Sequence, residues 1–185
     1  MFRRASLTLL VLLTSLSVAL ACGKERWAVK TGADRDIGDV NLTPEDTTIA
    51  ELSDLKAPPS PNTRPTTRFQ PAEFKTFKVS GILVGIKKEK DEDYHIVIQA
   101  PDDVEGTMIV ESVSPNCTDG SLFTQEIEDV RAAIDAKIKS IGSKLKKLNL
   151  PVIVMGIGFY DPIHGQTGVA PNGIELHPIL GIEFN

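Results

Sequence analysis

The chain is poor in several residue types that would define its class. In its 185 residues it holds two cysteines, one tryptophan and three histidines, and only 5% of the residues are aromatic. Two cysteines exclude a disulfide-dense small protein and a zinc site built on four cysteines. Few aromatics and a formal net charge of −5 argue against single-stranded nucleic acid as a partner, since such binding needs a positive groove and stacking rings.

Recognisable catalytic motifs are absent as well. The sequence has no Gly-x-Ser-x-Gly, no His-Glu-x-x-His, no phosphate-binding loop and no pair of histidines at helical spacing. We therefore expect a protein that is not an enzyme.

The one long apolar run lies at the N-terminus. Arg3 and Arg4 precede a mostly apolar stretch over 7–20, and Ala19-Leu20-Ala21 is a small-x-small cleavage site. This order is typical of a secretory signal peptide, which we predict over residues 1–21. The run is too short, and too interrupted by serine and threonine, to span a bilayer. We expect a secreted or periplasmic protein without a transmembrane segment.

Cys22 follows the predicted cleavage site and allows two interpretations. It could carry a lipid anchor, which would make the protein a lipoprotein, or it could form a disulfide with Cys117. Lipidation would leave Cys117 as a lone thiol in an oxidising compartment, so the disulfide is favoured.

Residues 22–72 are predicted to form an N-terminal extension. Residues 23–40 show little periodicity and are expected to be coil with at most one strand. Thr48 and Glu51 fit a capping box before a short helix over 49–55. Five prolines then fall within 58–71, which predicts an extended connector.

From residue 73 to 185 the pattern is that of a compact domain rich in strands. Alternating and β-branched residues predict strands over 77–86, 94–98 and 107–111, and seven consecutive charged residues separate the first two. This arrangement predicts a β-hairpin with a charged loop over 87–93.

An amphipathic helix is predicted next, with Thr124 as its N-cap. Gly142 is a candidate for its end or for a kink, and Pro151 bars its continuation. Apolar residues recur at spacings of three and four along one stripe: Ile127, Val130, Ile134, Ile138, Ile141, Leu145 and Leu148.

Two further strands, over 151–160 and 174–184, flank a long loop over 161–173 that is rich in turn-forming residues. The resulting β-β-β-α-β-β order predicts a mostly-β α+β domain, a small OB-fold-like five-stranded barrel with one amphipathic helix. A split sheet covered by one helix is the alternative.

Three segments resemble a group of uncharacterised secreted bacterial proteins with an OB-fold-like barrel. They run over 22–31, over 91–95 and from His164 to Pro178, the last reading His-Gly-Gln-Thr-Gly and then Asn-Gly-Ile-Glu-Leu-His-Pro. The resemblance implies that Cys22 belongs to the mature protein, and it implies no activity.

The three histidines, His95, His164 and His177, all fall near one end of the expected barrel. Nearby acids could supply oxygen ligands or orient the imidazoles: Asp91, Asp93, Asp161 and Glu175. A zinc or similar ion held by the three histidines is chemically sensible. However, no local spacing supports it, so hydrogen bonds to loop backbone or to a neighbouring acid are favoured and no cofactor is expected.

A loop as long as 161–173 is uncommon in a compact domain and is often functional. We predict that it and the charged loop 87–93 bind a polar ligand through imidazole, amide and hydroxyl groups: His95, His164, Gln166, Thr167, Asn172 and His177. The expected function is therefore a secreted, non-catalytic binding module. The alternatives are a metal-dependent hydrolase using the three histidines, and a single-stranded nucleic-acid-binding protein.

Overall fold

A computed structural model describes residues 22–23, 25–59 and 66–185. The predicted signal peptide, over 1–21, and the middle of the proline-rich connector lie outside the described residues. Within them the chain forms a mostly-β α+β fold with six strands in one sheet and three α-helices.

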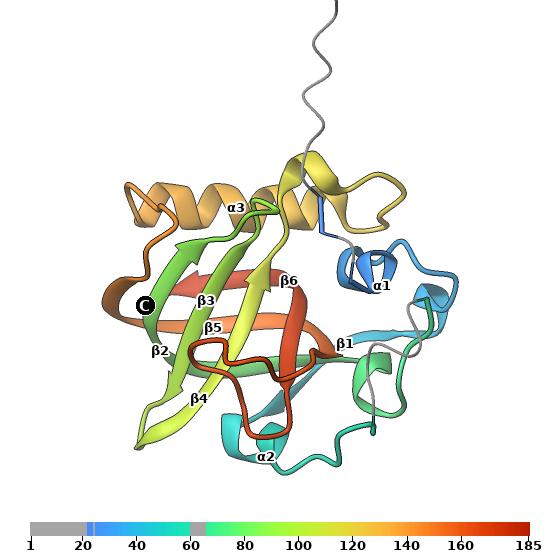
Figure 1. The fold of residues 1–185 in the computed structure, drawn as a ribbon, viewed down its shortest axis with the longest axis horizontal. Coiled ribbons are helices and arrows are strands. Elements are labelled where there is room, and N and C mark those ends of the chain that lie inside the picture. The colour runs from blue at the N-terminus through green and yellow to red at the C-terminus, as the bar shows by residue number, and fades with distance from the viewer. Residues whose placement is uncertain (1–21, 24, 60–65) are drawn as a thin grey trace, which may run out of the picture.

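The strands are β1 (Asn41–Thr47), β2 (Lys75–Lys88), β3 (Tyr94–Ala100), β4 (Asp103–Ser112), β5 (Lys146–Tyr160) and β6 (Ile174–Phe184). Their order in the sheet is β1-β2-β3-β4-β6-β5, and β2 pairs with β5 as well (Figure 1). The pairs β1–β2 and β4–β6 are parallel, whereas the others are antiparallel.

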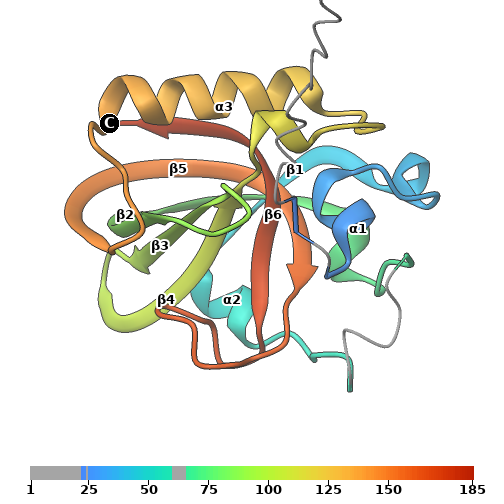
Figure 2. The same cartoon turned by 45° about the horizontal axis from the view of Figure 1, so that its top comes forward.

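The sheet is strongly curved. The pairings run from β2 through β3, β4, β6 and β5 and return to β2, and Figure 2 shows the long strand β5 bending around the others. The inner faces of these strands supply most of a continuous apolar core, which includes Leu83, Ile96, Val110, Val154 and Leu176.

The helices lie at the margins of the sheet. They are α1 (Trp27–Thr31), α2 (Ile49–Ser53) and α3 (Thr124–Lys137). In Figure 1, α3 crosses one end of the sheet, α2 lies at the opposite end and α1 lies to one side. The predicted short helix is confirmed: Thr48 caps α2, and its side chain and that of Glu51 form the reciprocal bonds of a capping box.

The long predicted helix ends earlier than its apolar stripe indicates. The helix α3 ends at Lys137, Ile138 has extended backbone angles, and Phe123 rather than Thr124 is the N-cap. Leu148 lies within β5, while Leu145 packs close to Gly85 of β2. Leu148 on a strand and Leu145 on a connecting loop are therefore partly buried without being helical. The strand β5 gains hydrogen bonds to β2 along its first half.

The N-terminal extension contains more structure than its sequence predicts. Residues 27–31 form α1 instead of coil, and 41–47 form β1, which the sequence did not indicate because its side chains are mostly exposed. β1 pairs with β2, so the extension contributes a strand to the same sheet.

Buried ion pairs and a disulfide hold this extension against the strands. Arg26 makes a two-pronged contact with Glu73, with both N–O distances 2.6 Å, and both side chains are almost fully buried. Arg68 pairs in the same way with Asp34, and both of these side chains are inaccessible. The predicted disulfide between Cys22 and Cys117 is confirmed. No helix of the described segments is long and apolar enough to cross a membrane.

Candidate functional site

A pocket of about 670 Å³ lies where the N-terminal segment meets the loops that follow β2 and β5. Thirteen residues line it: Cys22, Gly23, Glu25, Lys30, Glu89, Lys90, Asp91, His95, Glu111, Asp161, His164, Gln166 and Glu175. Six of them carry carboxylates and two are lysines. The pocket is therefore acidic, and both predicted binding loops contribute to it.

Strand pairing explains why distant residues meet at this pocket. His95 of β3 lies directly opposite Glu111 of β4 in the antiparallel ladder. On the other side of β4, the parallel register pairs Ile109 with Glu175 and Val110 with Leu176 of β6. Since side chains alternate along a strand, Glu175 and His177 project from the same side of β6 beside Glu111.

Glu111 lies between two histidines. His95 Nδ1 is 3.3 Å from Glu111 Oε1, and His177 Nδ1 is 3.2 Å from Glu111 Oε2. His95 also donates its Nε2 hydrogen to the carbonyl oxygen of Thr167 at 2.9 Å, because a carbonyl can only accept. The long loop is thus linked through His95 to Glu111.

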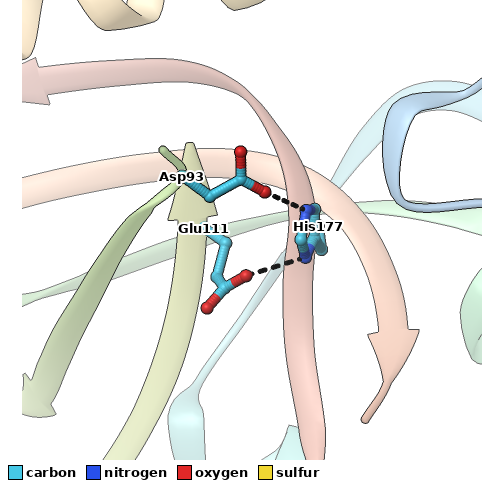
Figure 3. A group of neighbouring side chains, drawn as sticks. All are labelled: Asp93, Glu111 and His177. Carbon is cyan, nitrogen blue, oxygen red and sulfur yellow. Dashed lines mark ion pairs between the residues drawn. The ribbon is translucent and has the colours of Figure 1, made fainter. Parts of the chain in front are cut away.

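Asp93 lies on the far side of the His177 ring from Glu111. Its Oδ1 accepts a hydrogen bond from the backbone N–H of Ser114 at 2.7 Å, and its Oδ2 is 3.7 Å from His177 Nε2. Figure 3 shows the carboxyl groups of Asp93 and Glu111 each facing a different nitrogen of His177. The His177 side chain is fully buried, and its ring also meets Phe159 edge-on with centroids 5.5 Å apart.

This cluster is the place among the described residues where donors for a metal ion converge. One ligand atom each from Asp93, Glu111 and His177 lies within 4.8 Å of the others. The group shares only His177 with the histidine trio expected from the sequence, because Glu111 separates His95 from His177 and His164 lies at the margin of the pocket.

Burial shifts the ionisation of these groups. It raises the pKa of Asp93 to about 8, and the charges of Asp91 and Glu111 add to this effect. Burial lowers the pKa of His177 to about 3 against the attraction of Glu111. The pKa of Glu175 is raised well above its usual value by burial and by Glu111 and Asp161. At neutral pH, Asp93 is therefore protonated and His177 is a neutral imidazole.

Glu111 keeps its negative charge. Burial acts to raise the pKa of Glu111, but its hydrogen bond to His95 and the nearby positive charges outweigh burial and lower that pKa to about 2. Lys30 shows the complementary behaviour: burial acts to lower its pKa, yet Glu111, Asp161 and Glu175 raise it. The ammonium of Lys30 lies 3.7 Å from Asp161 Oδ1 and 5.4 Å from the centre of the Phe159 ring.

The loop 161–173 contributes differently at each of its predicted positions. The exposed imidazole of His164 lies 3.6 Å from Asp161, and Gln166 accepts from the His164 backbone N–H and donates to Asp161. Thr167 faces His95 through its carbonyl oxygen. Asn172 is outside the pocket lining and donates to the carbonyl oxygens of Leu52 and Leu55 in and after α2.

Glycine is required at one point of this loop. Gly168 has a φ of +85°, and a Cβ at this position would collide with the side chain of Val97. The loop can therefore lie against β3 only with glycine there.

Two important residues of the site, Glu111 and Lys30, did not stand out in the sequence analysis. Glu111 stands in the apolar strand Met108-Ile109-Val110-Glu111, as Glu175 stands between Ile174 and Leu176. A lone acid within an otherwise apolar strand is a signal that could have identified Glu111. Lys30 has no such signal because the charged N-terminal segment shows no periodicity.

The chain was compared with protein families, curated proteins and solved structures. No protein-family model, curated protein or solved structure matches the chain.

Proposed function

We propose that the protein is an exported, non-catalytic binding module whose acidic pocket takes a small polar ligand with a cationic group, an amine or a guanidinium. The observation that carries this proposal is the lining of the pocket, in which six acidic side chains stand with two lysines and two histidines. Charge of one sign in a cleft raises the local concentration of the opposite charge.

The architecture supports a binding role at this place. Counting β2, β3, β4, β5 and β6 as strands one to five, the pairing order is 1-2-3-5-4-1, with α3 between strands three and four. We take this order as an OB-fold-like barrel, in which the loops after strands one and four border the ligand site. In this chain those loops are 89–93 and 161–173, and both contribute to the pocket.

The size and chemistry of the pocket fit a small polar molecule. A volume of about 670 Å³ falls in the range of about 300–1,000 Å³ that is usual for small-ligand sites. Lys30 already neutralises part of the inner charge through Asp161. Glu89 is paired with Lys87 at 2.6 Å. The carboxylates of Glu25 and Asp91 are therefore the groups that we expect to meet the ligand.

The disulfide supports an extracytoplasmic location. Cys22 and Cys117 are bonded over a separation of 95 residues, and such bonds persist mainly in oxidising compartments. Cys22 also lines the pocket, so the disulfide holds one wall of the proposed binding site.

Fluorescence of Trp27, the only tryptophan, offers a direct test because Trp27 lies next to Gly23 of the pocket wall. We would titrate the oxidised, EDTA-dialysed protein with agmatine, a dication, and with 4-guanidinobutyrate, which replaces the amine by a carboxylate. We expect saturable binding of agmatine only, weakened by salt because outer charges are screened.

Variants locate the effect. Glu25→Gln and Asp91→Asn should each weaken agmatine binding about tenfold, whereas Glu128→Gln, an exposed change on α3, should leave it unchanged. Equal binding of the two compounds, or no loss in Glu25→Gln and Asp91→Asn, would reject the proposal.

A further inference from the structure

We infer that Asp93, Glu111 and His177 form a binding site for one divalent transition-metal ion beneath the acidic pocket. Asp93 and His177 do not line that pocket, so this site does not depend on the proposed amine ligand. Glu111 of β4, His177 of β6 and Asp93, the residue just before β3, supply it.

Unpartnered polar atoms point to an absent ligand. Among the described residues, neither ring nitrogen of His177 makes a hydrogen bond, nor does Oδ2 of Asp93, although all three atoms are buried. Buried polar atoms without a partner are uncommon, and each one costs free energy. These atoms lie in the same cluster (Figure 3), where a cation bound to one ring nitrogen of His177 would satisfy that nitrogen together with Oδ2 of Asp93.

The distances suit one ion after small movements. Metal–ligand bonds to histidine and carboxylate are about 2.0–2.2 Å, so two atoms on the same ion are at most about 4.4 Å apart. The short contacts of His177, 3.2 Å to Glu111 and 3.7 Å to Asp93, involve different ring nitrogens, Nδ1 and Nε2, and one ion can bind only one of the two. The full set, within 4.8 Å, needs to contract by only a few tenths of an ångström.

The surroundings hold the donors in place. The backbone N–H of Ser114 fixes Oδ1 of Asp93 and leaves Oδ2 directed at the cluster. His95 contacts the second oxygen of Glu111 and is itself held by the carbonyl of Thr167. Chains of this kind orient the ligands in metal sites.

The donor chemistry selects the class of ion. One imidazole with two carboxylates suits zinc, manganese, cobalt or iron(II), whereas calcium and magnesium prefer sets made only of oxygen. Glu111 lines the pocket and remains 12% exposed, which gives an ion a route from solvent. Three protein ligands leave a coordination position free for water.

The test is a calorimetric titration of the oxidised, EDTA-dialysed protein with zinc and with cobalt(II), and with calcium and magnesium as comparisons. We expect one equivalent of zinc or cobalt to bind, with d–d absorption from the cobalt complex, and no binding of calcium or magnesium at the same concentrations. If neither zinc nor cobalt(II) binds with one-to-one stoichiometry, the inference is overturned.

Near-isosteric variants assign the ligands. Asp93→Asn and Glu111→Gln should each weaken zinc binding at least about tenfold, while His164→Ala and Glu128→Gln should not change it. Unchanged affinity in Asp93→Asn and Glu111→Gln, or loss in His164→Ala, would overturn the assignment. We expect Asp91→Asn to weaken agmatine binding and Asp93→Asn to leave it unchanged. The amine site and the metal site are thus tested by different variants, and one proposal can fail while the other holds.

Discussion

The molecule buries charged groups in two regions that are built in different ways. Beside α1, each buried acid faces an arginine: Glu73 meets Arg26 and Asp34 meets Arg68, each through two hydrogen bonds. At and behind the pocket, Asp93, Glu111 and Glu175 share one lysine and two histidines, and Oδ2 of Asp93 and both ring nitrogens of His177 lack a hydrogen bond among the described residues. In the first, matched region each acid has an arginine as its counterion, and Arg26 Nε is the one buried atom of these four side chains without a hydrogen bond among the described residues. The second, unmatched region has an excess of acid that is available to a cation.

The two regions also differ in how many hydrogen bonds their carboxyl groups accept. Each oxygen of Glu73 accepts from Arg26 and from one backbone N–H, that of Tyr160 or that of Phe69. Asp93 receives a single backbone bond on one oxygen from Ser114. The carboxyl group of Glu73 therefore has all its hydrogen bonds within the fold, whereas that of Asp93 has an oxygen that can still accept one.

The largest effect should follow from breaking the matched region. In Glu73→Gln, the new amide would oppose N–H donors, and Arg26 would keep a buried charge without a counterion. We expect a loss of about 3–5 kcal/mol in the free energy of unfolding, measured by urea denaturation.

The exposed ion pair of Lys78 and Asp46 provides the control. Lys78→Ala should cost less than about 1 kcal/mol. If Glu73→Gln costs no more than Lys78→Ala, the matched region does not stabilise the fold as argued.

Removal of the disulfide should rank next. Cys22→Ser with Cys117→Ser frees a loop closed over 95 residues, and the expected loss is about 2–4 kcal/mol. Agmatine binding should weaken too, because Cys22 and Gly23 form part of the pocket wall. Reduction of the wild-type protein should reproduce both changes; a double variant as stable as the oxidised protein would contradict the expectation.

Asp93→Asn repeats the acid-to-amide change in the unmatched region. The amide oxygen can keep the bond from Ser114, and the change removes a buried carboxyl group whose other oxygen has no hydrogen-bond partner among the described residues. In metal-free protein the free energy of unfolding should therefore change by less than about 1 kcal/mol. If Asp93→Asn lowers the free energy of unfolding as much as Glu73→Gln does, the two regions do not differ in the way argued.

His164→Ala should have the smallest effect. Its side chain is 65% exposed at the pocket margin, so stability should stay within about 0.5 kcal/mol. Agmatine affinity should fall by only about two- to fivefold, which the Trp27 titration can measure. Marked destabilisation would show that His164 supports the loop rather than the ligand.

Local signals in the sequence predicted much of the fold. The capping box of Thr48 and Glu51, the hairpin around the charged loop 87–93 and the strand pattern depend on neighbouring residues, and the structure contains all three. The end of α3 was predicted wrongly because Leu145 and Leu148 continue the helical spacing by coincidence while packing from another element. β1 was missed because it is stabilised by pairing with β2 and buries little of its own.

The candidate site was predictable only in part. The histidines and loop 161–173 stood out by their rarity and length, and the structure brings His95 and His164 to one pocket with His177 directly behind Glu111. The roles of Glu111 and Lys30 depend on strand register and on the fold of the extension. The partners of Arg26 and Arg68 lie 47 and 34 residues away, at distances over which local patterns carry no information.

Calorimetric titration of the unaltered, oxidised and metal-free protein with agmatine at low ionic strength tests the central claim most directly. The acidic pocket should bind one equivalent with heat that diminishes as salt is added, while 4-guanidinobutyrate gives no saturable heat. Binding of neither compound, or of both with the same affinity, would contradict the claim that unmatched carboxylates make this pocket a site for cations.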